Sequence, residues 1–214
     1  MNQDNIIKIY ARNDNRIQLK MIPGHFVTSQ SHITHYLDLT TMKSRCAEAQ
    51  RIASALAANY EASIPVDTIV CMDGLEVIGA YLAEELTKAG VLSMNAHQTI
   101  YVITPEYTSG SQIILRDNLA PMVRGKHVLI LSASITTGYT VQAAIEAVNY
   151  YGGTVAGLSA IFATTHECLG IPVTSIFDPS SLPDYASFDS RDCPMCKAGQ
   201  PIDALVNSFG YSAL

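Results

Sequence analysis

The sequence predicts an α/β protein built around a parallel sheet that helices cover on both faces. After Pro65, short apolar runs alternate with segments of helical periodicity. Such runs are typical of strands that are buried on both sides of a parallel sheet. The length of 214 residues suffices for one domain of this kind with a sizeable core, and is short for two.

Composition argues against several classes of protein. Hydrophobic residues make up 48% of the chain and charged residues 15%, which is not the composition of a disordered protein. The net charge of −6 argues against a nucleic-acid surface and against a polybasic membrane patch. No apolar run approaches the ~20 residues that cross a bilayer, and the N-terminus lacks a signal-peptide pattern. We therefore expect a cytoplasmic protein.

The N-terminal third begins with a polar segment and continues with aromatic, His, Ser and Thr residues. Two strand-like pieces surround Phe26 and Tyr36. Residues 41–60 are predicted to form a helix, because apolar residues recur there at helical spacing and Thr41 can cap the first turn.

The remaining elements follow from the alternation after Pro65. Predicted strands cover residues 67–72, 99–104, 128–131, 154–163 and 173–177. Predicted helices cover residues 75–88, with Gly90 just past the end, and 141–150, which Gly152 and Gly153 end. Residues 105–125 form a long loop or a hairpin around an apolar triplet at 113–115. Ligands of parallel sheets bind beyond the carboxyl ends of the strands, so the loops that begin at Met72, Pro105 and Ser132 are the places to search.

One of these loops has the residues of a phosphate site. Strand 128–131 runs into Ser-Ala-Ser-Ile and then Thr136-Thr137-Gly138-Tyr139-Thr140, after which a helix begins. Free backbone N–H groups and the helix dipole favour an anion at such a point, and threonine hydroxyls can donate to it. The alternative is that Thr140 is only a helix cap and Gly138 only a turn. The position after the most apolar strand favours the phosphate site.

The segment VLILSASITTGYT resembles the phosphoribosyl-diphosphate (PRPP) signature of type I phosphoribosyltransferases, which has four apolar residues, two acidic residues, two further positions and T-T-G-x-T. Three other segments are similar to the orotate branch of that family and occur in its order. They are Gly24-His25-Phe26 with Ser29, His32, Tyr36 and Asp38; residues 74–83; and the tail at 193–202.

This resemblance implies a type I phosphoribosyltransferase-like domain over residues 1–214. Its twisted parallel sheet is flanked by helices, and residues 1–40 with the C-terminal tail form a small hood. It also implies a homodimer that binds PRPP or a nucleoside 5′-phosphate, with Mg²⁺ if the protein is active and no cofactor otherwise. The implied phosphate or PRPP-binding residues are Ser132, Ser134, Thr136, Thr137, Gly138, Tyr139 and Thr140. Asp73, Gly74 and Glu76 are diphosphate-loop candidates, and Phe26, Ser29, His32 and Tyr36 are base-side candidates.

Three departures from the family pattern leave the catalytic residues unknown. Ser132 and Ala133 replace the acidic pair that contacts ribose and helps to arrange the metal. Residues 103–110 lack the family's basic residues, and Arg116, Arg124 and Lys126 come later in the chain. Ile78 and Gln30 replace glycines. Either the protein is a transferase with a rearranged site, or it is a non-catalytic sensor or regulator. We favour lost or altered catalysis. A pure interaction protein is a weaker third possibility.

Two acidic residues and one tyrosine have alternative roles. Asp73 and Glu76 could bind Mg²⁺ or a ligand hydroxyl, or they could serve the following helix. We expect Asp73 to cap that helix and leave Glu76 open. Tyr139 could stack on a ligand, but we expect it to pack on the sheet.

The pair Cys193 and Cys196 offers two thiolates where a closed zinc site needs four ligands. His166 and Cys168 could complete the set, the pair could be shared across a dimer, or it could serve redox chemistry. The six histidines are dispersed without metal spacing. We therefore expect a structural tail and no metal site.

Overall fold

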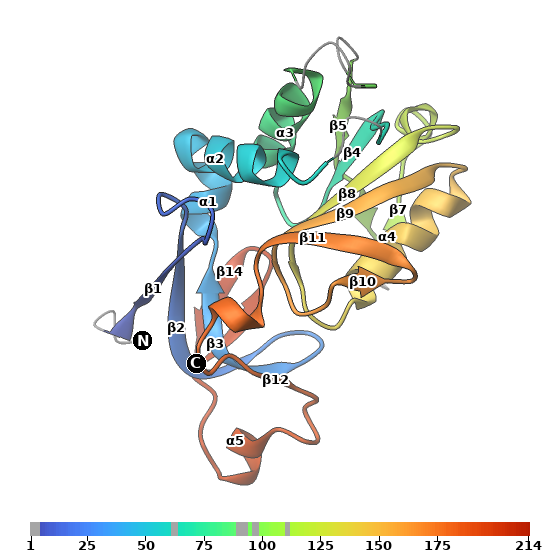
Figure 1. Ribbon diagram of the computed structural model, residues 1–214. Coiled ribbons are helices and arrows are strands. Elements are labelled where there is room, and N and C mark those ends of the chain that lie inside the picture. The colour runs from blue at the N-terminus through green and yellow to red at the C-terminus, as the bar shows by residue number, and fades with distance from the viewer. Residues whose placement is uncertain (1–4, 61–63, 89–93, 96–98, 110–111) are drawn as a thin grey trace. The chain divides into compact units, whose positions relative to one another are not determined.

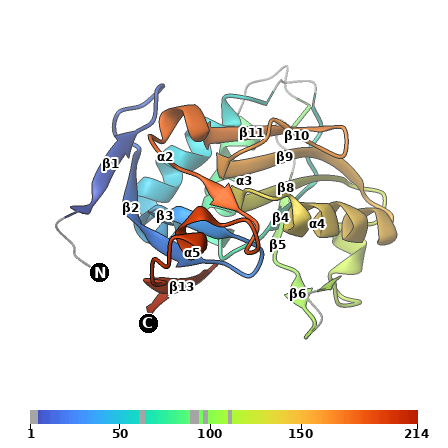
Figure 2. The ribbon, with the colours of Figure 1, turned by 90° about the horizontal axis from the view of Figure 1, so that it is seen from below.

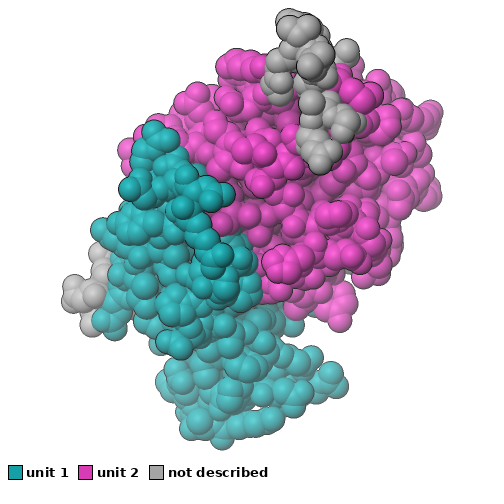
Figure 3. All heavy atoms as spheres, in the orientation of Figure 1, with its two compact units in different colours: residues 1–41, 177–214 teal, residues 42–176 magenta. Residues whose placement is uncertain are grey.

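In the part of the chain that the structure describes, two six-stranded sheets and one two-stranded sheet organise the fold (Figure 1). The computed structural model describes residues 5–60, 64–88, 94–95, 99–109 and 112–214. The chain divides into unit 1, residues 1–41 and 177–214, and unit 2, residues 42–176 (Figure 3). The N-terminal segment and the C-terminal tail therefore share one unit. That the whole chain acts as a single domain stays a prediction.

The sheet of unit 2 has the strand order β10-β11-β9-β8-β4-β5. Its strands are β4 (Thr68–Cys71), β5 (Tyr101–Ile103), β8 (His127–Ile135), β9 (Thr154–Ala163), β10 (Glu167–Cys168) and β11 (Ile171–Phe177). The pairs β4–β5, β4–β8 and β8–β9 are parallel, whereas β10 pairs with β11 in antiparallel fashion at the edge. The predicted parallel sheet is confirmed, with this antiparallel pair added.

Helices cover both faces of this sheet (Figure 1, Figure 2). They are α2 (Cys46–Ala57), α3 (Glu76–Lys88) and α4 (Tyr139–Tyr150). In β4, Cys71 lies next to Gly79 of α3, whereas Val70 and Met72 belong to the core beneath α4. Successive residues of a strand face opposite sides, so α3 and α4 lie on opposite faces. None of the described helices is long and apolar enough to span a membrane.

Several element boundaries differ from the prediction. The helix expected at 41–60 consists of α1 (Thr40–Ser44) and α2, so Thr41 lies inside α1 and does not cap it. The N–H of Thr40 instead donates to Asp38 Oδ1 at 3.0 Å. Of the two possibilities for residues 105–125, the hairpin is confirmed as β6 (Glu106–Tyr107) and β7 (Ile113–Ile114), followed by a 3₁₀ turn at Ala120–Met122. Gly90 lies outside the described residues.

Unit 1 is a second sheet, of order β12-β3-β2-β13-β14, with β1 also paired to β2. Its elements are β1 (Ile7–Tyr10), β2 (Gln18–Val27), β3 (His32–Asp38), a 3₁₀ turn (Pro179–Ser181), β12 (Ser187–Phe188), α5 (Pro194–Lys197), β13 (Ala204–Asn207) and β14 (Gly210–Ala213). The strand-like pieces predicted around Phe26 and Tyr36 are thus β2 and β3. Both residues pack with Ile33 and Ala204 in a core of their own.

Candidate functional site

The loop predicted to bind phosphate joins β8 to α4. Residues 136–138 form a bend, and Gly138 precedes the helix with φ 79° and ψ −11°. Side chains disfavour this left-handed conformation, whereas glycine adopts it without strain. The first N–H groups of α4 have no acceptor within the helix, so they are available to an anion beyond β8. Thr140 lies inside α4, so the alternative that it caps the helix is wrong.

Hydroxyl groups of this segment are open to solvent. Ser134, Thr137 and Thr140 are exposed, and Thr136 is half-buried. The backbone oxygen of Thr136 accepts a hydrogen bond from Thr164 Oγ1 at 2.7 Å, which ties the start of the bend to the residue after β9. The loop is therefore anchored through its backbone, while the residues that carry its hydroxyls are mostly exposed.

Two side chains of the segment lie elsewhere than the sequence predicted. Ser132 is in β8, where it pairs with Ala160 of β9, so the loop begins after Ile135 and not at Ser132. The serine is 1% exposed and its hydroxyl donates to Asp73 Oδ2 at 3.0 Å. Tyr139, which we expected to pack on the sheet, is 62% exposed at the start of α4. That expectation is wrong, because the first turn of α4 projects this ring away from the core.

A carboxylate from the turn after β4 lies beside the two positions that lack the acidic pair. Asp73 Oδ2 accepts hydrogen bonds from Ser132 Oγ and, at 3.2 Å, from Ala133 N. Asp73 and Gly74 have φ values of 59° and 74°, so the chain makes a left-handed turn directly after β4. Because α3 begins at Glu76, Asp73 does not hold its cap position, and the predicted cap is wrong. The carboxylate instead joins the turn after β4 to β8.

The other residues of the 74–79 segment belong to α3. Glu76 is its first residue, where a negative charge complements the helix dipole, and Glu76 Oε1 accepts a hydrogen bond from Thr104 Oγ1 at 2.8 Å. Ile78, which stands where the family has a glycine, is fully buried in the helix. A Cβ added to Gly79 would lie 2.3 Å from Cys71 Sγ, so glycine allows α3 to approach β4 closely.

The basic residues that follow the hairpin are either paired with another side chain or lie at the far end of β8. Arg116 forms an ion pair with Glu106 of β6, with Nη2 2.6 Å from Oε2. Lys126 directly precedes β8, and Arg124 lies two residues further upstream. A strand rises about 3.3 Å per residue, so the length of β8 separates these two cations from the phosphate loop by more than 20 Å. Among the described residues, none of the three replaces the missing cations of the mobile loop.

Tyr107 of the hairpin reaches the residue that follows β4. Its hydroxyl donates to Met72 Sδ at 3.9 Å. Burial, and then the charge of Asp73, raise the pKa of Tyr107 to about 12. The phenol therefore stays protonated at neutral pH and can act as a donor beside Asp73.

The base-side candidates all belong to unit 1, whereas the phosphate and diphosphate candidates belong to unit 2. Phe26 is fully buried and its ring centroid lies 6.1 Å from that of Tyr36, so both serve the core of their sheet. Ser29 is exposed in the turn between β2 and β3. A contact of these residues with a base stays a prediction.

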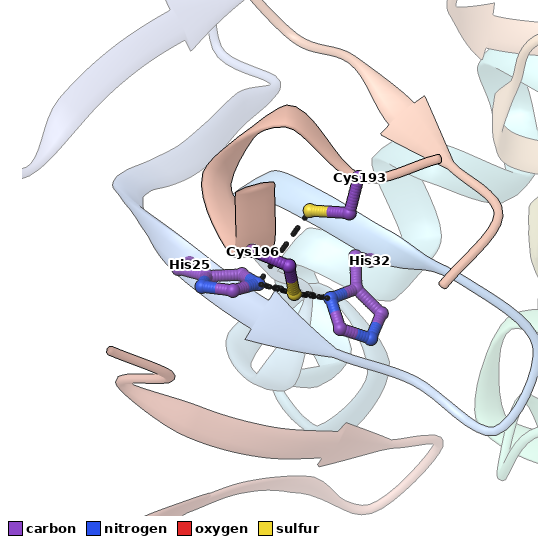
Figure 4. Close-up of side chains that lie close together, drawn as sticks. All are labelled: His25, His32, Cys193 and Cys196. Atoms are coloured by element: carbon purple, nitrogen blue, oxygen red, sulfur yellow. Dashed lines mark hydrogen bonds between the residues drawn. The ribbon is translucent and has the colours of Figure 1, made fainter. Parts of the chain in front are cut away.

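Four side chains of unit 1 form a cluster that the sequence did not reveal. The ligand atoms of His25, His32, Cys193 and Cys196 all lie within 4.8 Å of one another (Figure 4). Burial, and then the charge of His25, lower the pKa of His32. The negative charge of Asp189 acts in the opposite direction and raises this pKa, but by less. His166, which we considered as a partner of the cysteines, is not among them. The two pairs come from opposite ends of the chain, so spacing alone gives no signal beyond the Cys-x-x-Cys pattern.

Comparison with known proteins identifies sequences that are similar to the whole chain. No protein-family model matches the chain. The orotate phosphoribosyltransferase of Pelotomaculum thermopropionicum is 27% identical over 203 residues, which cover 94% of this chain and 95% of that protein. The orotate phosphoribosyltransferase of Desulforamulus reducens is 26% identical over 206 residues, with the same two coverages.

Solved structures show the same fold. The UMP synthase of Leishmania donovani superposes with a TM-score of 0.55 at 18% identity over 84% of this chain, which spans 36% of that longer chain. The adenine phosphoribosyltransferase of Trypanosoma brucei gives a TM-score of 0.52 at 15% identity over 79% of both chains. The chain is thus a phosphoribosyltransferase-like protein that resembles orotate phosphoribosyltransferases and has the type I phosphoribosyltransferase fold.

Proposed function

We propose that this protein binds a 5′-phosphorylated ribose compound, PRPP or a nucleoside 5′-monophosphate, at residues 136–140. The observation that carries the proposal is the left-handed Gly138 at the start of α4, directly after the buried strand β8. Backbone N–H groups of the first turn and the hydroxyls of Thr137 and Thr140 would donate to the phosphate oxygens. The net charge of −6 repels anions overall, so these local donors have to supply the attraction.

We further propose that binding proceeds without efficient phosphoribosyl transfer. Transfer builds negative charge on the departing diphosphate, which preorganised cations usually stabilise. Arg116 is held by Glu106, and no cation stands in the hairpin where the family has its basic residues. Ala133 offers no group to the ribose, and the hydroxyl of Ser132 already donates to Asp73. These features support a sensor or regulatory protein that has kept the phosphate site.

Magnesium, which the resemblance implies for an active enzyme, fits the described residues poorly. Mg²⁺ takes octahedral oxygen ligands, usually one or two carboxylates together with phosphate oxygens and water. Asp73 supplies a carboxylate in the turn after β4 and Glu76 one at the start of α3, but each already accepts hydrogen bonds from protein groups. We therefore expect ligand binding to depend little on Mg²⁺.

The second candidate function is transfer of the phosphoribosyl group to orotate, as the names of the relatives suggest. It is favoured by similarity along 94% of the chain and by the Asp73 carboxylate beside the acidic-pair positions. In that case Mg²⁺ would be required, and the protein would serve pyrimidine biosynthesis. Under either function we propose a cytoplasmic homodimer.

Calorimetry on the full chain tests the binding site. We expect ribose 5-phosphate and uridine 5′-monophosphate to bind, and uridine, which lacks the phosphate, not to bind. Thr137→Ala combined with Gly138→Ala should abolish binding. Because alanine at φ 79° strains the backbone, Thr137→Ala with Thr140→Ala provides a second variant that leaves Gly138 intact. Thr154→Ala, at the exposed amino end of β9, is the matched control. Unchanged affinity in both loop variants would refute the site.

A turnover assay separates the two functions. Orotate, PRPP and Mg²⁺ are incubated with the protein, and released diphosphate is measured. We expect no release above background, with PRPP affinity unaltered by chelating Mg²⁺. Diphosphate release that depends on orotate and is lost in the Thr137→Ala, Thr140→Ala variant would establish the transferase instead.

A further inference from the structure

The His/Cys cluster of unit 1 consists of two imidazoles and two thiols that face one another (Figure 4). His25 lies near the end of β2 and His32 begins β3, whereas Cys193 directly precedes α5 and Cys196 lies inside it. The first three residues are buried, and Cys196 lies on the exposed side of the cluster. None of these four side chains takes part in the proposed phosphate site.

Hydrogen bonding alone does not account for the cluster. His25 Nδ1 lies 3.0 Å from the backbone oxygen of Gln200, which can only accept, so this nitrogen carries the proton. His25 Nε2 therefore has a single lone pair. That one atom lies 2.9 Å from His32 Nδ1, 3.7 Å from Cys193 Sγ and 3.6 Å from Cys196 Sγ. One lone pair cannot accept from three donors, whereas it can bind one metal ion that all four atoms share.

The separations agree with tetrahedral zinc. Zinc bonds of about 2.3 Å to sulfur and about 2.0 Å to nitrogen place S and N ligands about 3.5 Å apart and two N ligands about 3.3 Å apart. The observed S–N distances are 3.7 and 3.6 Å around His25 and 3.3 Å between Cys196 Sγ and His32 Nδ1. The N–N distance of 2.9 Å is shorter by a few tenths of an ångström. A small outward shift of one ring would bring this pair to the separation of two zinc ligands.

We propose that His25, His32, Cys193 and Cys196 bind one Zn²⁺ ion. Two thiolates with two imidazoles are a donor set that zinc prefers over the oxygen-seeking Mg²⁺ and Ca²⁺. All four positions are filled by protein, which leaves none for a substrate or a water. The site is therefore structural and not catalytic.

The surroundings hold the ligands in place as an outer shell of a zinc site does. The Gln200 oxygen fixes the orientation and proton position of the His25 ring. The backbone N–H of His25 donates to Asp203 Oδ2 at 2.7 Å, and a Cβ on Gly24 would lie 2.8 Å from that same oxygen. Cys193 O accepts from Lys197 N at 3.1 Å, which closes the turn that directs both sulfurs to one side.

The ion would join the two ends of the chain. His25 and Cys193 are 168 positions apart, and the β2–β3 hairpin and α5 come from the two segments that make up unit 1. A cross-link that closes so long a loop removes much conformational freedom from the unfolded chain. Zinc would thus fix the C-terminal tail to the N-terminal sheet.

The test is metal analysis of the full chain, purified without a histidine tag or chelators. We expect about one zinc per chain in the wild type. The Cys193→Ser, Cys196→Ser variant should lose the zinc, and so should His32→Asn. Cys46→Ser and Cys168→Ser alter cysteines outside the cluster and should keep it.

Cobalt substitution guards against variants that fail to fold. Wild-type protein, stripped of metal and titrated with Co²⁺, should develop the visible bands of tetrahedral cobalt and a sulfur-to-cobalt charge-transfer band, both saturating near one equivalent. Octahedral cobalt spectra, zinc well below one equivalent in the wild type, or a Cys193–Cys196 disulfide in freshly purified protein would each overturn the proposal.

Discussion

Asp73 Oδ2, in the turn that follows β4, lies 3.0 Å from Ser132 Oγ of the neighbouring strand β8. Ser132 stands where the phosphoribosyltransferase signature has the first of its acidic pair. Strand β8 therefore has a hydroxyl at this position, and the carboxylate of Asp73, from the turn after β4, lies beside the same backbone. This arrangement is the basis of the first two predictions.

Asp73→Ala should lower the free energy of unfolding by about 2 to 4 kcal/mol. The change removes the acceptor of the Ala133 N–H and leaves the buried Ser132 hydroxyl only the backbone oxygen of Ser134, at 3.2 Å, and it places alanine at φ 59°. Asp73→Asn keeps an oxygen acceptor and tolerates the left-handed backbone, so it should cost less than about 1 kcal/mol. Urea denaturation measures both, and equal losses would show that the hydrogen bonds contribute nothing.

Ser132→Asp restores half of the acidic pair, but the Asp73 carboxylate already occupies its surroundings. Two carboxylates about 3 Å apart resist joint ionisation, which raises the pKa of one of them in the folded state. A folded-state pKa above the unfolded value gives stability at low pH that is lost as pH rises. The variant should therefore lose stability from about pH 4 upwards relative to the uncharged control Ser132→Asn. Parallel stability curves for the two variants would contradict this.

Gly79→Ala should weaken the contact between α3 and β4. Its Cβ would lie 2.3 Å from Cys71 Sγ and 3.1 Å from Val102 Cγ1, and the overpacking should cost about 1 to 2 kcal/mol despite the better helix propensity of alanine. Combining it with Cys71→Ala removes the nearer atom. A double-mutant cycle in urea should then give a favourable coupling of at least about 0.5 kcal/mol. Strict additivity would locate the strain elsewhere.

Tyr60→Phe should change the stability of the protein differently at neutral and at alkaline pH. The Tyr60 hydroxyl lies 2.6 Å from Ser159 Oγ, and Ser159 is fully buried, so the variant should be less stable by about 1 kcal/mol at pH 7. Burial, which outweighs hydrogen bonds from Ser159 and Thr174, raises the pKa of Tyr60 to about 12.

The sign of the alkaline effect follows from that pKa. A folded-state value above the unfolded value of about 10 gives stability that is present below pH 10 and lost as pH approaches 12. Only the wild type loses this contribution, so its advantage over Tyr60→Phe should shrink between pH 10 and 12. An advantage that stays constant in thermal unfolding over this range would contradict the assignment.

The sheet of unit 2 could be predicted because its strands carry a local signal. Strand β4 and helix α3 have apolar patterns with the periods of their structures, and both were predicted to within a residue or two. The predicted end of β8 at Leu131 is wrong, because serines such as Ser132 and Ser134 are typical of loops. Their pairing with β9 makes them part of the strand, and that pairing is a tertiary contact with no local mark.

The candidate site also has a part that could be predicted from the sequence and a part that could not. Gly138 could be recognised locally, because its conformation and the helix that follows depend on adjacent residues. The bond from Asp73 to Ser132 and the meeting of His25 with Cys193 depend on segments far apart in sequence. Patterns with a period of a few residues do not contain such information.

Strand β2 pairs in parallel with β13, and His25 binds Asp203, a residue synthesised 178 positions later. A ribosome adds roughly 5 to 20 residues per second, so Asp203 is synthesised roughly 10 to 35 s after His25. During that interval the part of β2 that pairs with β13, at Phe26 and Val27, lacks this partner, and open strand edges can pair with other nascent chains. Slow translation or loss of the final residues should therefore favour aggregation before release, even when the residues of unit 2 are complete.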